Sequence, residues 1–303
     1  MLSTLSKTNF IRKSRSVEKI GSQSIWSFFD ANPTSRPASN HAIRGGGGHP
    51  VSSYLELARK VAELQFLNRD HVLLFRGQSK DYLTTKGNSM LKASIFRHEG
   101  KKVPSRAVLE RRFATLLCAE KLLVEAYGAA RLKGLERLRR QRLIRWSILQ
   151  HYEICKTPLL DVTHSLRVAS SFATDGNDGD EAYLYAFGVP NLSGAITASS
   201  EAGLQIVRLS SACPPDAVRP HIQEGYLVGE YPEIPDYEQQ SHYEFHEMDF
   251  GRRLVAKFRF NPKSFWASEH HQPAPHDALY PSAQDPLLEI AQQIIATLSK
   301  EFA

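Results

Sequence analysis

The chain has 303 residues, of which 42% are hydrophobic and 23% are charged, a composition typical of a globular protein. No run approaches the roughly 18 apolar residues that a membrane-spanning helix requires, so we expect a soluble protein without a membrane partner. The net charge of +6 favours an anionic partner, either nucleic acid or a phosphorylated small molecule, without choosing between them.

The three cysteines, Cys118, Cys155 and Cys213, lie far apart and form no CxxC motif. This spacing indicates neither a disulfide framework nor a zinc site, so no metal is predicted. A reducing compartment fits best, and we expect a cytoplasmic location.

Residues 1–50 are predicted to form a flexible basic tail and a Gly-rich linker. Residues 1–17 contain four basic and no acidic side chains, which favours a disordered tail and leaves a mitochondrial transit peptide as the alternative. Residues 31–50 are rich in Pro, Ser, Asn and Gly and end in Gly45-Gly46-Gly47-Gly48-His49-Pro50, which is typical of a linker. A phosphate-binding loop is disfavoured because no Lys-Ser/Thr pair follows the glycines.

The next segment is predicted to be mainly helical. Ser53 and Glu56 form a capping box for a helix over 52–68, and a short apolar strand over 71–75 follows. Ser105 is a candidate cap for a helix with apolar residues at a period near 3.6. Residues 131–151 are predicted to form a basic helical stretch.

After residue 180 the pattern changes to short apolar runs over 183–189, 204–209 and 254–260, which predict strands. The last run alternates, which predicts one buried face and one wet face that carries Lys257 and Arg259. Asp285-Pro286 begins a closing amphipathic helix. We therefore predict an α+β fold, with a helical N-terminal part packed on a mostly antiparallel sheet.

Arg76 follows the apolar strand, where it can present a planar set of donors to a phosphate or carboxylate. The alternative is an ordinary surface ion pair at a strand end. Gly77 allows a sharp turn or the close approach of a ligand.

A second polar cluster comprises Gln150, His151, Asp161, Thr163 and Ser165. Asp161 or Thr163 can cap a helix that starts near Leu166, and this is the ordinary structural explanation for both. Capping does not account for the other polar residues beside them.

These segments resemble the FRG domain in their order along the chain. The resemblance rests on Phe75-Arg76-Gly77-Gln78, Ser94-Ile95-Phe96-Arg97, Trp146 to Tyr152 and Leu159-Leu160-Asp161-x-Thr163. The family pattern would have Gly at Glu153, Arg at Pro158 and Trp at Val162. The FRG domain is poorly understood and often accompanies bacterial defence or mobile-element proteins. The resemblance implies a domain over 51–262, followed by an extension over 263–303 that ends in the amphipathic helix.

A weaker resemblance links the order of Arg76, the Thr163-x-Ser165 turn and a late Gln223-Glu224-Gly225 segment to mono-ADP-ribosyltransferases, whose fold this chain would then share. It implies that Arg76 holds the diphosphate of NAD and that Thr163 or Ser165 positions the nicotinamide ribose. Glu224 would stabilise the positive charge that develops as the glycosidic bond breaks. Gln223 is the competing occupant of that role, and a polar hairpin turn is the structural alternative.

The functional expectation is an FRG-domain protein that binds NAD or a related dinucleotide and transfers or hydrolyses ADP-ribose. The expected catalytic residues are Arg76, Thr163 and Glu224, and the ligand contacts are Phe75, Arg76, Gly77, Gln150, His151, Asp161, Thr163, Ser165 and Gln223. The alternative is a noncatalytic ligand-sensing module. Nucleic acid could bind to the basic residues of 131–145, although most such helices are simply solvated.

Two metal-like patterns are set aside. The first is the HxxxH pair of His242 and His246, followed by Glu247, for which the sequence shows no third metal ligand. The Asp175-Gly-Asn-Asp-Gly-Asp180 segment departs from a calcium loop, because Gly179 stands at a ligand position.

Overall fold

A computed structural model describes residues 24–98, 102–241, 249–267, 270–280 and 285–302. Within these residues the main sheet has eight strands in the order β3-β10-β6-β4-β5-β9-β8-β7, and its neighbours are antiparallel except for β10 and β3. The strands are β3 (His49–Pro50), β4 (Val72–Gln78), β5 (Leu160–Thr163), β6 (Ala182–Val189), β7 (Ile196–Ser199), β8 (Leu204–Arg208), β9 (Gly225–Glu230) and β10 (Leu254–Phe260). A small antiparallel sheet pairs β1 (Ile25–Ser27) with β2 (Arg36–Ala38).

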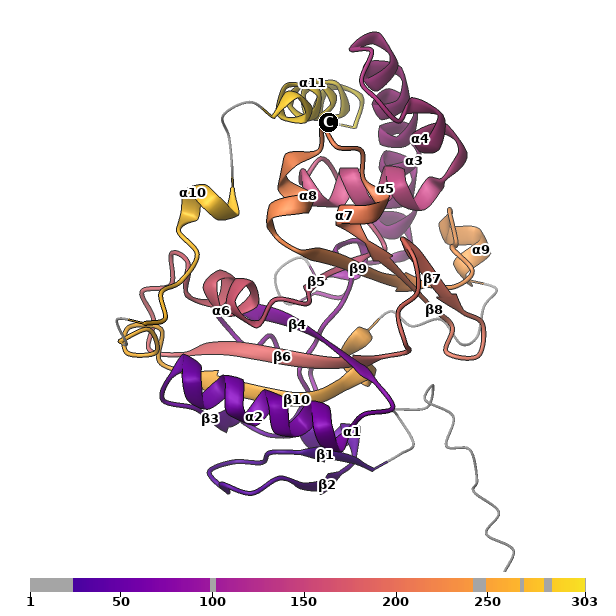
Figure 1. The fold of residues 1–303 in the computed structure, drawn as a ribbon. Coiled ribbons are helices and arrows are strands. Elements are labelled where there is room, and N and C mark those ends of the chain that lie inside the picture. Colours follow the sequence, from indigo (N-terminus) through magenta and orange to yellow (C-terminus); the bar gives the residue numbers. More distant parts are fainter. Residues whose placement is uncertain (1–23, 99–101, 242–248, 268–269, 281–284, 303) are drawn as a thin grey trace, which may run out of the picture.

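Helices surround the sheet, and the predicted α+β class is confirmed (Figure 1). The helices are α1 (Asn40–Gly45), α2 (Tyr54–Leu67), α3 (Arg106–Ala129), α4 (Leu135–Arg140), α5 (Arg142–His151), α6 (Leu166–Thr174), α7 (Leu209–Ala212), α8 (Val218–Ile222), α9 (Tyr237–Ser241), α10 (His276–Leu279) and α11 (Pro286–Glu301), with the 3-10 turns η2 (Ser94–Phe96) and η3 (Phe250–Arg253).

The predicted caps of three helices are confirmed. Ser53, Ser105 and Asp285 each accept a backbone N–H of the first turn, in α2, α3 and α11. The basic stretch is a pair of helices, since the backbone is extended at Gln141 between α4 and α5.

The main sheet divides into two four-stranded halves at β4 and β5. These strands share a single paired position, Phe75 with Thr163, whereas β4 pairs with β6 along its whole length. The strands therefore diverge beyond that pair (Figure 1). A cleft opens where they separate.

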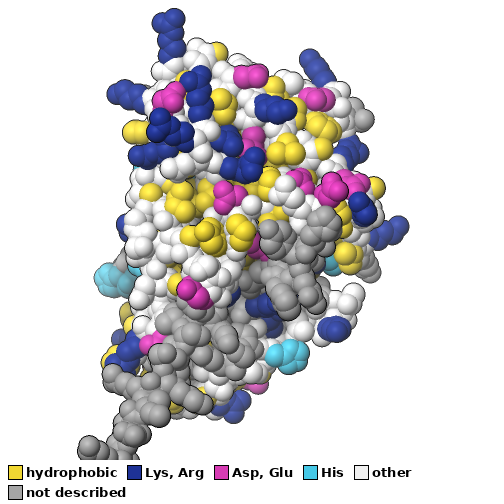
Figure 2. Space-filling view, turned by 90° about the vertical axis from the view of Figure 1, so that its right-hand side faces the viewer, with side chains coloured by type: hydrophobic (Ala, Val, Ile, Leu, Met, Phe, Trp, Pro, Cys, Tyr) yellow, Lys and Arg dark blue, Asp and Glu magenta, His cyan; other side chains and the backbone are white. Residues whose placement is uncertain are grey.

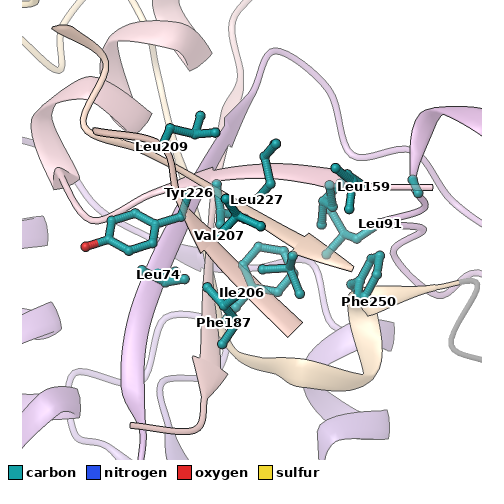
Figure 3. Close-up of a cluster of buried hydrophobic side chains, with 14 of the residues drawn as sticks. Leu74, Leu91, Leu159, Phe187, Ile206, Val207, Leu209, Tyr226, Leu227 and Phe250 are labelled. Carbon is teal, nitrogen blue, oxygen red and sulfur yellow. The ribbon is translucent and has the colours of Figure 1, made fainter. Parts of the chain in front are cut away.

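The two halves of the sheet nevertheless share one hydrophobic core. Figure 3 shows Leu74 and Phe187 from the β4–β6 half beside Ile206, Val207 and Leu227 from the β8–β9 half. Each of these five side chains is at most 2% exposed. Removing so much apolar surface from water fixes the two halves against each other.

Residues 31–50 are folded, so the predicted linker is wrong for this segment. His49 and Pro50 form β3 and pair with β10, and the His49 side chain is buried. The buried Asn40 amide donates to the backbone oxygens of Gly251 and Leu254, at 3.0 and 2.9 Å. These distant contacts supply the stabilisation that the local composition lacks. Residues 1–17 lie outside the described residues.

The predicted wet face of β10 is also wrong at Lys257, whose side chain is 1% exposed. Its Nζ lies 2.7 Å from Asp81 Oδ2 and 2.8 Å from Ser89 Oγ. Asp81 also accepts a hydrogen bond from the Tyr185 hydroxyl at 3.0 Å. The segment after β4 and the N-terminal part therefore cover a sheet face that alternation alone predicts to be solvated. Arg259, by contrast, is exposed as predicted.

Candidate functional site

A cleft with a volume of about 950 Å³ lies where β4 and β5 separate. Its walls come from β4, η2, the end of α5, β5, α6 and the start of β9. Arg76 and Thr163, which the sequence places 87 positions apart, both line this cleft. The two segments that carry the family resemblance therefore meet in space.

Arg76 lies on β4, and only part of its guanidinium group is hydrogen-bonded. Its Nη1 donates to the backbone oxygen of Asp161 at 2.7 Å, while the buried Nε has no partner among the described residues. Burial, and then the neighbouring Arg97, lower the pKa of Arg76 to about 10, so the side chain stays charged at neutral pH. Within the described part of the chain it forms no salt bridge. The surface ion-pair alternative therefore does not describe Arg76.

The cleft is basic around Arg76. Lys92, Arg97, His98 and Lys156 line the same cleft, and Arg97 Nε donates to the backbone oxygen of Lys92 at 3.1 Å. The sequence predicted no role for these four residues, because they come from a loop region without periodicity. The only available signal was Arg97, within one of the segments that carry the family resemblance.

Gly77 is required mainly by packing against α6. A Cβ added at Gly77 would lie 1.8 Å from the backbone oxygen of Ala169 and 2.9 Å from the nitrogen of Ala173. No side chain fits there. Gly77 also borders the cleft, so the expectation that it allows the close approach of a ligand stays a prediction. Its neighbour Phe75 is 2% exposed and belongs to the core.

Gln150 holds Asp161 in place. Gln150 Nε2 donates to Asp161 Oδ2 at 2.5 Å, and its Oε1 accepts from the hydroxyls of Ser94 and Thr157, at 3.0 and 2.6 Å. Both ends of the amide are therefore occupied, so Gln150 connects η2, α5 and β5. Asp161 lines the cleft as a carboxylate whose orientation is fixed.

Ser165, rather than Asp161 or Thr163, caps α6. Its Oγ accepts from the backbone N–H of Val168, and Ser165 is not among the residues that line the cleft. The Thr163 hydroxyl accepts from the Ser165 N–H at 3.0 Å and lies 3.1 and 3.0 Å from the backbone oxygens of Gln223 and Glu224. Thr163 therefore ties β5 to the turn before β9.

Gln223, and not Glu224, faces the cleft at this turn. Gln223 is 7% exposed, lines the cleft and donates from Nε2 to the backbone oxygen of Leu279 at 2.5 Å. Glu224 is exposed, has a left-handed backbone with φ of 46° and is absent from the cleft lining. Of these two residues, the structure thus places only Gln223 in the cleft lining.

His151 lies at the end of α5 and lines the cleft. Burial lowers the pKa of its imidazole, so the neutral ring predominates at neutral pH. Its Nε2 has no partner among the described residues. The cleft thus contains a neutral imidazole nitrogen as well as the Arg76 cation.

Comparison with known families identifies part of this site: residues 71–182 match the family model described as the FRG domain. The chain carries an FRG domain. A search of curated proteins finds no match, and a search of solved structures finds none either.

The matched FRG segment contributes Arg76, Arg97, His151, Asp161 and Thr163 to the cleft. It also contains Glu153, whose φ of 55° lies in the left-handed region that favours glycine. Glycine is the residue that the resemblance predicts at that position, so the backbone conformation accounts for this part of the family pattern.

Five of the residues that line the cleft come from beyond the FRG match: Leu209, Gln223, Gly225, Tyr226 and Tyr280. Gln223 precedes β9, and Tyr280 follows α10 in the predicted C-terminal extension. The Tyr280 ring meets Phe172 of α6 edge-on at 5.8 Å. The extension therefore closes one end of the FRG cleft, and α11 packs against α3.

Among the described residues, three of the seven cations of the basic stretch, Arg139, Arg142 and Arg145, pair with acidic side chains. Buried Glu120 accepts from Arg145 Nε at 2.7 Å and from Arg142 Nε at 3.4 Å, and Arg139 pairs with Glu136. In Figure 2, dark blue side chains gather near the top of the view, with acidic ones among them. This arrangement gives the predicted nucleic-acid surface little support.

Among the described residues no cluster of His, Cys, Asp or Glu could hold a metal ion. The histidine pair at 242 and 246 lies outside them. No described helix is both long and apolar enough to cross a bilayer.

Proposed function

We propose that the FRG cleft binds a phosphorylated ligand of the nucleotide class, with NAD or a related dinucleotide as the first candidate. The observation that carries this proposal is the half-buried Arg76 guanidinium, which lies near Arg97, has a buried Nε and forms no salt bridge with a carboxylate among the described residues. Two neighbouring cations repel each other, and an anion between them would remove this repulsion. A phosphate oxygen would also accept from the unpartnered Nε.

The size and lining of the cleft support a ligand larger than a phosphate ion. Its volume of about 950 Å³ lies at the upper end of the roughly 300–1,000 Å³ of small-molecule sites. Tyr82 borders the cleft and is 53% exposed, so its ring is available to stack on a base. A dinucleotide would fill this space with its diphosphate at the basic end.

Ligand binding is better supported than ADP-ribose transfer. Transfer or hydrolysis needs a carboxylate to stabilise the cation that forms when the nicotinamide bond breaks. Glu224 points elsewhere, and the uncharged Gln223 occupies the cleft. The acids that line the cleft are Asp161, whose Oδ2 is engaged by Gln150, and Glu153. A noncatalytic ligand-sensing role is therefore the function that this geometry favours.

Calorimetric titration of the full chain with NAD and with inorganic pyrophosphate tests this proposal. We expect both to bind and pyrophosphate to displace NAD, because both would use Arg76. Nicotinamide release is followed in the same samples, with Glu224→Gln as a matched variant. Absence of binding by both probes at millimolar concentration would refute the proposal, and nicotinamide release abolished by Glu224→Gln would show that the protein is an enzyme instead.

A further inference from the structure

The hydrogen bonding of His151 specifies which ring nitrogen is free. His151 hydrogen-bonds the backbone of Arg219, and this bond raises the pKa of the imidazole. A bond with that effect favours the protonated form, so the ring N–H donates to a carbonyl oxygen. Because Nε2 has no partner among the described residues, the donor is Nδ1. In the neutral ring, Nε2 is then an acceptor with a free lone pair.

This acceptor lies in a buried environment that requires a partner. Burial lowers the imidazole pKa more than Asp161 and the Arg219 backbone raise it, while the charges of Arg219 and Asp285 act in opposite directions. A buried acceptor left without a hydrogen bond is destabilising by roughly 1–3 kcal/mol. A donor that enters the cleft would remove this penalty.

We infer that His151 Nε2 accepts a hydrogen bond from the ligand, so that the ligand combines a phosphate group at Arg76 with a hydroxyl or N–H donor. This inference rests on the proposed ligand-binding function and narrows its ligand class. A bare phosphate or diphosphate would contact Arg76 but would offer no hydroxyl or N–H donor to His151. A ribonucleotide supplies both features through its phosphates and its ribose hydroxyls or base N–H groups.

The charged neighbours of His151 differ from those of Arg76, which supports separate contacts for the two ligand features. The pKa of Arg76 is shifted by the charges of Arg97, Asp161, Tyr185 and Tyr82. The pKa of His151 is shifted by the charges of Asp161, Arg219 and Asp285. Asp161 is thus the charged neighbour that both share, whereas Arg97 affects Arg76 alone. Gly225, without a side chain, borders the cleft beside the His151 ring.

Titration of His151 variants with NAD and with pyrophosphate tests the inference. We expect His151→Phe to weaken NAD binding about tenfold, which corresponds to one lost hydrogen bond, and to leave pyrophosphate affinity within about twofold. His151→Gln, whose amide oxygen can accept, should recover most of the loss. Equal NAD affinity in wild type and His151→Phe, or equal losses for both probes, would overturn the inference while leaving the proposed anion site intact.

A measurement on the unmodified protein avoids dependence on variant folding. Nitrogen NMR of the imidazole should show His151 protonated at Nδ1, and its Nε2 resonance should shift with NAD but not with pyrophosphate. Protonation at Nε2 instead, or equal shifts with both probes, would overturn the inference. If neither probe binds wild type, the proposed function fails, and this inference fails with it.

Discussion

Phe75 on β4 pairs directly with Thr163 on β5, and among the described residues this is the one position of strand pairing between the two halves of the main sheet. The next residue along β4 is Arg76, and the Thr163 hydroxyl is tied to the turn that contains Gln223. The pairing of Phe75 with Thr163 therefore sets the position of Arg76 relative to the turn that contains Gln223. The Phe-Arg-Gly motif lies on the β4 side of this junction, and the Leu-Leu-Asp-x-Thr motif lies on its β5 side.

Gly77→Ala should destabilise the fold by more than about 3 kcal/mol, because its Cβ would overlap the Ala169 backbone and force α6 away from β4. Urea denaturation of wild type and variant measures this change. Gly47→Ala is the matched control, since a Cβ there meets nothing within 4 Å. A Gly77→Ala protein as stable as the control would contradict this account of the motif.

Lys257→Met should lower the free energy of unfolding by about 3–5 kcal/mol, because it leaves Asp81 buried without its cationic partner. Lys263→Met provides the comparison, since the Lys263–Asp180 pair is exposed and such pairs contribute about 0–1 kcal/mol. Chemical denaturation distinguishes the two cases. Similar small losses in both variants would show that the Lys257–Asp81 pair is dispensable.

Stability should fall as the pH drops below 6.5. Burial lowers the pKa of both His49 and His151 from that value, so between pH 6.5 and the lower folded-state pKa the unfolded chain binds more protons. The stabilisation is therefore complete above pH 6.5 and is lost as the pH falls through the folded-state values. Urea midpoints from pH 8 to pH 5 measure this slope.

The slope should be shallower in His49→Gln and in His151→Gln than in wild type. His41→Gln is the control, because His41 is exposed. An unchanged slope in both buried-site variants would mean that these histidines do not cause the loss of stability below pH 6.5.

Helices α2, α3 and α11 and strands β4, β6, β8 and β10 were predictable because their signals are local. Ser53, Ser105 and Asp285 precede apolar residues at helical spacing, and each caps the helix that follows. The order of family segments also placed Arg76 and Thr163 in one cleft. Both features depend on neighbouring residues or on the order of the family segments, and neither requires knowledge of long-range packing.

The remaining features depend on partners that are distant in sequence. Lys257 alternates like a solvated residue, and only Asp81, 176 positions away, makes it buried. Residues 31–50 resemble a linker until Asn40 meets the residues before β10. The choice between Gln223 and Glu224 depends on the turn before β9, where Gln223 is buried while Glu224 has a positive φ and is exposed. No local pattern encodes these three outcomes.

The most direct test of the account is the affinity of Arg76→Ala for pyrophosphate, measured by calorimetry beside Arg259→Ala, which removes an exposed arginine from β10. Arg76→Lys, which keeps the charge but removes Nε, allows the same comparison if the alanine variant is unstable. The account predicts that Arg76→Ala weakens binding at least about tenfold and that Arg259→Ala has no effect. Wild-type affinity in a folded Arg76 variant would contradict it.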